Sequence, residues 1–93
     1  MDRRQREENT IKFCEDVKTL VGDEFVTKCD EPRIILTASG NCLLFLSSAN
    51  LNAEEQRRLH RRILFHLHCR NEESMIEYVE FQENVIVFKM MPQ

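Results

Sequence analysis

The sequence predicts a small α+β domain in which two helices accompany an antiparallel or mixed sheet of four to five strands. Three observations predict this class. Two long segments repeat apolar residues every three or four positions, as helices do, and the shorter segments are rich in β-branched and aromatic residues. The chain has only two glycines and two prolines, which leaves little room for linkers. We therefore expect residues 1–93 to form one domain in the order α-β-β-β-α-β-β.

Residues 2–21 are expected to form the first helix, which Gly22 ends. Its apolar stripe consists of Phe13, Cys14, Val17, Leu20 and Val21. The opening turns are almost entirely polar, so we expect residues 1–9 to fray or to project from the domain.

Five segments read as strands, and two pairs of them are joined by short turns. The predicted strands are residues 25–29, 33–38, 41–48, 75–81 and 85–90. Ser39-Gly40-Asn41 is a hairpin turn signal, and residues 82–84 connect the last two strands. Hairpins pair neighbouring strands in opposite directions, which favours an antiparallel sheet.

The second helix is expected over residues 52–70. Asn52 is a good N-cap, and Glu55 stands three residues later, where a capping-box carboxylate bonds back to the cap. At 100° per residue one side of this helix is apolar, and its members are Leu59, Ile63, Leu64 and Leu67.

The opposite side of this helix carries Arg57, Arg58, Arg61 and Arg62, with Phe65 among them. These arginines are the densest positive charge in a chain whose net charge is −3. Three interpretations stay open: a solvated face, a contact with an acidic protein partner, or binding to the phosphates of a nucleic acid. Arginine serves carboxylate and phosphate alike, so spacing does not separate the last two.

Some predicted strands are apolar on both sides rather than alternating, notably residues 42–46 and 85–88. If both helices cover one face of the sheet, the other face needs a partner chain, for which symmetric self-association is the commonest solution. The residues we favour for that contact are Leu44, Leu46, Ile86 and Phe88, together with Phe65. The alternative is a monomer with one helix on each face.

Nothing in the sequence predicts catalysis, a metal or a cofactor. His66 and His68 are two residues apart, so they would point away from each other on a helix, and the cysteines form no C-x-x-C pair. No phosphate-binding loop, nucleophile elbow or dinucleotide fingerprint is present. The four cysteines, Cys14, Cys29, Cys42 and Cys69, are expected to be buried free thiols.

The order helix, strand pair, helix, strands is similar to that of roadblock-type scaffold subunits of dynein and Ragulator, a resemblance in element order that supplies no function. The sequence lacks the apolar core of a signal peptide and any run long enough to span a bilayer. We therefore expect a non-catalytic scaffold subunit in the cytoplasm or nucleus, which self-associates or docks into a larger complex. Nucleic-acid binding through the arginines is the alternative.

Overall fold

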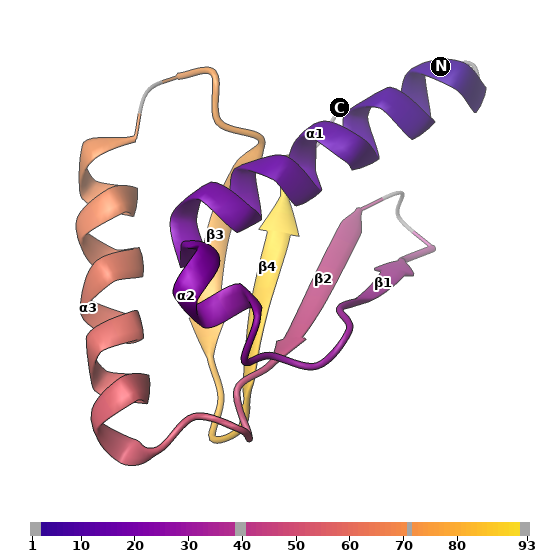
Figure 1. The fold of residues 1–93 in the computed structure, drawn as a ribbon. Helices are drawn as coiled ribbons and strands as arrows, with labels where there is room; N and C mark the ends of the chain where they lie inside the picture. Colours follow the sequence, from indigo (N-terminus) through magenta and orange to yellow (C-terminus); the bar gives the residue numbers. More distant parts are fainter. Residues whose placement is uncertain (1–2, 39–40, 71, 92–93) are drawn as a thin grey trace.

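The computed structural model describes residues 3–38, 41–70 and 72–91, in which three helices pack beside a four-stranded sheet (Figure 1). This arrangement confirms the α+β class that the sequence predicts. The helices are α1 (Arg3–Val21), α2 (Asp23–Val26) and α3 (Ala53–Cys69). The strands are β1 (Arg33–Leu36), β2 (Cys42–Ser47), β3 (Ile76–Phe81) and β4 (Val85–Met90).

The strands lie in the order β1-β2-β4-β3, and each neighbouring pair is antiparallel. The predicted pairing is therefore confirmed, with β2 and β4 at the centre and β1 and β3 at the edges. The β1–β2 connection closes where the Thr37 N–H donates to the Asn41 carbonyl, 2.9 Å away. Ser39 and Gly40, which belong to the predicted hairpin turn, lie outside the described residues.

One predicted strand is wrong. Residues 25–29 do not join the sheet; they form the end of α2 and the turn that follows it. Gly22 adopts φ +84°, which turns the chain sharply after α1, and the side chain of Phe25 then packs into the core. The pattern is ambiguous because Phe25 and Cys29 are four positions apart. Residues at that spacing share one side of a strand and also one side of a helix.

The start of α3 follows the predicted capping box. The Asn52 side chain accepts a hydrogen bond from the Glu55 backbone N–H at 2.8 Å, and the Glu55 carboxylate accepts one from the Asn52 N–H at 3.2 Å. Leu59 and Ile63 are buried as expected, and Leu67 packs against the core. Leu64 is an exception, since its side chain is half exposed to solvent.

The buried part of α1 is its C-terminal half, where Phe13, Val17, Leu20 and Val21 enter the core. The Asp16 carboxylate connects this helix to the residue before β3, because it accepts a hydrogen bond from the Met75 backbone N–H at 2.8 Å. Residues 3–8 are exposed, and this end of α1 extends beyond the sheet (Figure 1). Residues 1–2 of the predicted projecting start lie outside the described residues.

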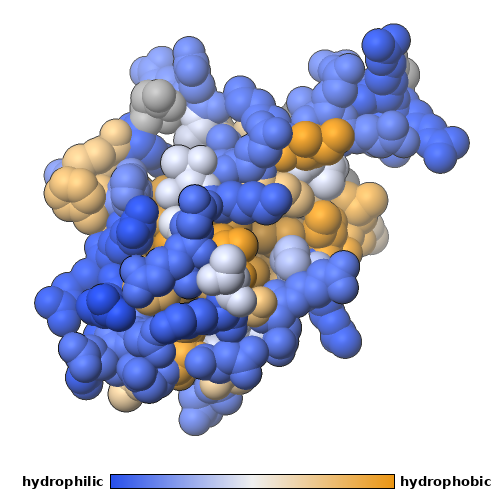
Figure 2. All heavy atoms as spheres, viewed as in Figure 1, coloured by the Kyte–Doolittle hydropathy of each residue, from blue (hydrophilic) through white to orange (hydrophobic). Residues whose placement is uncertain are grey.

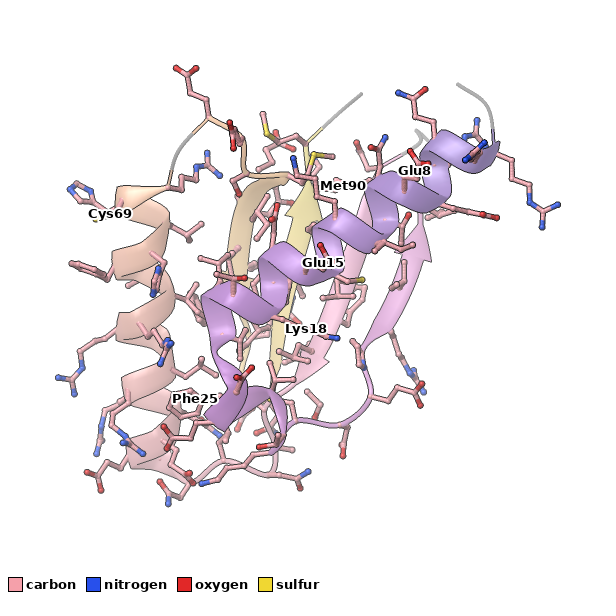
Figure 3. The ribbon with its side chains drawn as sticks, turned by 45° about the horizontal axis from the view of Figure 1, so that its top comes forward. Glu8, Glu15, Lys18, Phe25, Cys69 and Met90 are labelled. Carbon is pink, nitrogen blue, oxygen red and sulfur yellow. The ribbon has the colours of Figure 1, made fainter. Side chains whose placement is uncertain are left out.

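Both long helices cover the same face of the sheet. α1 crosses in front of the strands, and α3 runs beside it along the β3 side (Figures 1 and 3). One core cluster unites residues of α1, α2 and α3 with alternate residues of β2 and β4. Within the described residues, no helix lies on the opposite face of the sheet, which we call the open face.

Candidate functional site

Successive side chains of β2 and β4 point to opposite faces of the sheet, and this determines which apolar residues are available to a partner. Leu44, Leu46, Ile86 and Phe88, which the sequence favoured for a partner contact, are at most 3% exposed, because they pack against the helices of the same chain. These four residues therefore offer no surface in this structure. Their side chains point toward the helices, so a partner contact on β2 and β4 stays a prediction and would have to use other side chains of these strands.

The open face is formed by the side chains at the alternate positions of the strands, which point away from the helices. Ile35 of β1 lies opposite Leu43 of β2, and Phe45 of β2 lies opposite Val87 of β4. Val87 is only 5% exposed although it is outside the core cluster, and it lies between Phe45 of β2 and Glu80 of β3. The apolar residues at odd positions of the same strands were the signal for this face in the sequence.

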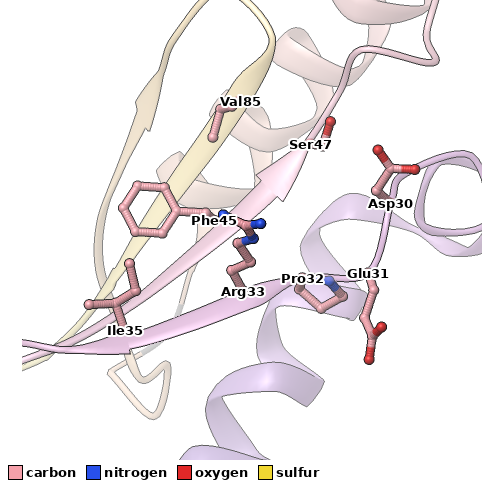
Figure 4. Close-up of a pocket in the computed structure, with 8 residues that line it drawn as sticks. All are labelled: Asp30, Glu31, Pro32, Arg33, Ile35, Phe45, Ser47 and Val85. Carbon is pink, nitrogen blue, oxygen red and sulfur yellow. The ribbon is translucent and has the colours of Figure 1, made fainter.

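A groove of about 720 Å³ lies on the open face near the beginning of β1 (Figure 4). Ile35, Phe45 and Val85 form its apolar part and point to the same side of the sheet. Asp30 and Glu31 lie where the chain enters β1, and Arg33 lines the groove as well, so its polar border carries both acidic and basic side chains. The groove thus combines an apolar centre with a polar border, an arrangement that protein interfaces commonly have.

The opposite end of the open face is charged. Lys89 of β4 forms an ion pair with Glu77 at 3.4 Å, and its ammonium lies 5.3 Å from the centre of the Tyr78 ring. Glu80, the cross-strand neighbour of Val87, is exposed. Apart from the Tyr78 ring on β3, the apolar part of the open face therefore lies on β1, β2 and the first half of β4.

The four arginines of α3 are all exposed, but they are not equivalent. Arg58 forms an ion pair with Glu24 at 3.5 Å and lies over the Phe25 ring, 5.7 Å from its centre. The guanidinium of Arg62 lies against Gly22. Two arginines thus attach α3 to the α1–α2 corner, whereas Arg57 and Arg61 form no ion pair with any residue in the described ranges.

Phe65 is 65% exposed and adjoins Leu64, which is 50% exposed, so the outer side of α3 has a small apolar patch. The patch faces solvent, in agreement with the predicted position of Phe65 opposite the buried stripe. Seen from the helix side, the apolar areas of the surface are small and are surrounded by hydrophilic side chains (Figure 2).

The histidines and cysteines are dispersed. Among the described residues no three His, Cys, Asp or Glu side chains lie close enough to hold a metal ion. His60 stacks on Phe81 with the ring centres 3.9 Å apart, and this contact gives it a packing role.

The cysteines depart in part from the prediction of burial. All four are free, but only Cys42 is fully buried; Cys14 and Cys29 are half-buried, and Cys69 is exposed at the end of α3. Burial raises the pKa of Cys14, Cys29 and Cys42, and the nearby Asp30 carboxylate raises that of Cys29 further. These three are poor nucleophiles at neutral pH, because the thiolate is the reactive form.

None of the helices within the described residues is both long enough and apolar enough to cross a membrane. Comparison of the chain with protein-family models, with curated proteins and with solved structures found no match.

Proposed function

We propose that this chain is a non-catalytic protein-interaction subunit whose open face binds a partner protein. The observation that carries the proposal is the placement of both long helices on one face of the sheet, which leaves Ile35, Leu43, Phe45 and Val85 without a covering layer in the described structure. Burying one large apolar side chain is worth about 1.5–3 kcal/mol, so a protein partner that covers this face gains several such contributions.

The roles of the polar side chains support a binding subunit rather than an enzyme. Asp16 holds Met75, Glu55 caps α3, and Arg70 donates to the carbonyl groups of Ile76 and Glu77 at the start of β3. Each of these groups has a structural partner. We also propose that the chain acts inside the cell, in the cytoplasm or nucleus, where free thiols such as these four are stable.

The experiment compares two substitutions that remove an exposed or half-exposed phenylalanine from different surfaces. Phe45→Gln changes the open face, and Phe65→Gln, the matched control, changes the outer side of α3. The tagged full-length chain is captured from its native cells, with nuclease treatment, and the co-purified proteins are identified.

We expect wild type and Phe65→Gln to recover the same partner and Phe45→Gln to lose most of it, while all three keep the same circular dichroism spectrum. Recovery of the partner by Phe45→Gln at the wild-type level would contradict the proposal. Loss with Phe65→Gln alone would instead assign the contact to α3.

Nucleic-acid binding is a second candidate, and one observation favours it. Arg57 and Arg61 are exposed on successive turns of α3 without an ion pair in the described ranges, and the Phe65 ring that follows is available for stacking on a base. The overall net charge of −3 and the use of Arg58 within the chain make it the weaker candidate.

A further inference from the structure

The exposed apolar side chains gather at one edge of the sheet. Of the eight large apolar residues that are exposed in the described ranges, three are consecutive in β1: Ile34, Ile35 and Leu36, which are 44%, 47% and 70% exposed. A fourth, Ile11 of α1, lines a surface groove together with Leu36. In the space-filling view, hydrophobic atoms are visible below the N-terminal half of α1, on the side of β1 (Figure 2).

Among the residues that the structure describes, the outer backbone edge of β1 pairs with no other strand. The Thr37 N–H donates toward β2, to the Asn41 carbonyl, and backbone groups alternate sides along a strand. Arg33 and Ile35 therefore point their N–H and C=O groups toward β2, whereas Ile34 and Leu36 point theirs away from the sheet. Proteins usually protect such an edge with charges, prolines or short strands; Pro32 and Arg33 protect the start of β1 in this way, but residues 34–36 are all apolar.

We propose that a second copy of this chain pairs with β1 in the antiparallel direction, about a two-fold axis at Ile35, so that two four-stranded sheets form one of eight strands. Ile35 of one copy then lies opposite Ile35 of the other, and Ile34 lies opposite Leu36. The outward N–H and C=O groups of Ile34 and Leu36 form four hydrogen bonds between the copies.

Pro32 and the length of β1 select this register. A symmetric pairing in which the outward groups meet must be centred on Ile34, Ile35 or Leu36. Centring on Ile34 places Leu36 opposite Pro32, which has no N–H to donate. Centring on Leu36 places Ile34 opposite Ala38, which is beyond the end of β1. Only the pairing centred on Ile35 keeps all four bonds within the strand.

Charge complementarity favours a second copy as the occupant. Beyond Leu36 the antiparallel strand of the other copy continues back through Pro32 to Glu31 and Asp30. Arg6 and Glu7 both line the groove beside Leu36; Glu7 is paired with Arg3 at 3.3 Å, whereas Arg6 forms no ion pair with the described residues. In the proposed dimer the acidic segment of each copy approaches this Arg6 of the other, and the symmetry produces the contact twice.

This inference shares with the proposed function only the view that the chain binds protein. It uses the backbone edge of β1; the side chain of Ile35 belongs to both surfaces, whereas Phe45 belongs to the open face alone. The two proposals therefore fail separately: a dimer that persists in Phe45→Gln leaves the edge pairing intact whatever happens to the other partner.

Disulfide trapping tests the register in the full chain, with Cys69→Ser as the background because Cys69 is the exposed native thiol. Paired residues at the centre of such a contact have Cα atoms about 4.5 Å apart, within the range that a disulfide spans. Under mild oxidation, Ile35→Cys is expected to convert most of the chain to a covalent dimer, doubling the mass from 11.1 kDa. The Cys69→Ser parent is expected to stay uncrosslinked.

Ile34→Cys and Leu36→Cys provide the control for register. Two copies of Ile34 would be offset by two residues, about 8 Å apart, which is too far for a disulfide. Each variant alone is therefore expected to give little covalent dimer, whereas an equimolar mixture of the two gives a covalent heterodimer.

Three further outcomes would overturn the inference. The first is self-coupling of Ile34→Cys as efficient as that of the mixture, because it requires another register. The second is a wild-type chain that light scattering finds monomeric at 1 mM. The third is a wild-type dimer together with an Ile35→Cys variant that forms no disulfide between its copies. Because residues 34–36 are exposed, circular dichroism spectra of the cysteine variants are expected to match wild type.

Discussion

The guanidinium of Arg62, on α3, lies against Gly22, the residue between α1 and α2. A Cβ atom at position 22 would be 2.7 Å from the Arg62 Cζ atom, closer than side chains normally approach. Gly22 also has φ +84° and ψ 150°, a backbone conformation that is almost exclusive to glycine. The backbone conformation is therefore the main reason for a glycine at the corner that directs Phe25 into the core, because the exposed Arg62 guanidinium ends a flexible side chain that can shift.

We predict that Gly22→Ala lowers the free energy of unfolding by about 1–3 kcal/mol, because the backbone conformation is strained for any residue with a Cβ. Urea denaturation measures the loss. The same substitution in an Arg62→Ala background separates the two causes, since truncating Arg62 removes the close contact and leaves the strain. Equal stability of Gly22→Ala and wild type would contradict the described geometry of this corner.

Two neighbouring apolar residues of α3 test how the helix is oriented on the sheet. Ile63 is fully buried and Leu64 is half exposed. We predict that Ile63→Ala lowers the free energy of unfolding by about 2–5 kcal/mol, because it leaves a cavity in the core. Leu64→Ala, measured in the same denaturant series, is expected to change it by less than about 0.5 kcal/mol. Similar losses for both would mean that the helix is rotated from the position described.

Stability is expected to fall at acidic pH through Glu55. The hydrogen bond from Lys28, with that from the Asn52 backbone N–H, lowers the pKa of Glu55 from its ordinary 4.5. The ionised form therefore stabilises the fold above pH 4.5, and this contribution is lost as the pH falls through the lowered pKa of the folded state. Thermal unfolding between pH 7 and pH 3 measures it.

Glu55→Gln keeps the shape of the side chain and removes its ionisation. The variant is expected to be less stable than wild type at pH 7, and the difference is expected to shrink as the pH falls below 4.5. A difference that stays constant from pH 7 to pH 3 would show that the carboxylate charge does not contribute.

A separate prediction concerns nucleic-acid binding by the arginine side of α3. If Arg57 and Arg61 contact phosphates, replacing both with Gln reduces the slope of log affinity against log salt by about 2, because each arginine neutralises roughly one phosphate. The matched control is Arg3→Gln with Arg4→Gln, which removes two exposed arginines at the start of α1. Absence of RNA and DNA binding in 50 mM salt would exclude this second candidate.

The local features of this chain were predictable because they depend on neighbours in sequence. The Asn52–Glu55 capping box, the buried stripe from Leu59 to Ile63 and the bounds of β4 all follow from residue types at fixed spacing. Spacing was misleading at residues 25–29, where five residues fit a strand and a helical turn equally well.

Residue patterns were enough to predict an α+β domain whose strands have more apolar surface than two helices on one face can cover. The placement of both helices on the same face, which makes Leu44 and Phe88 core and leaves Phe45 and Ile35 accessible, was known only from the folded chain. Alternating side chains give a strand two sides, but they do not show which side a helix will cover. Contacts between distant residues, such as Asp16 with Met75, decide which side the helices cover.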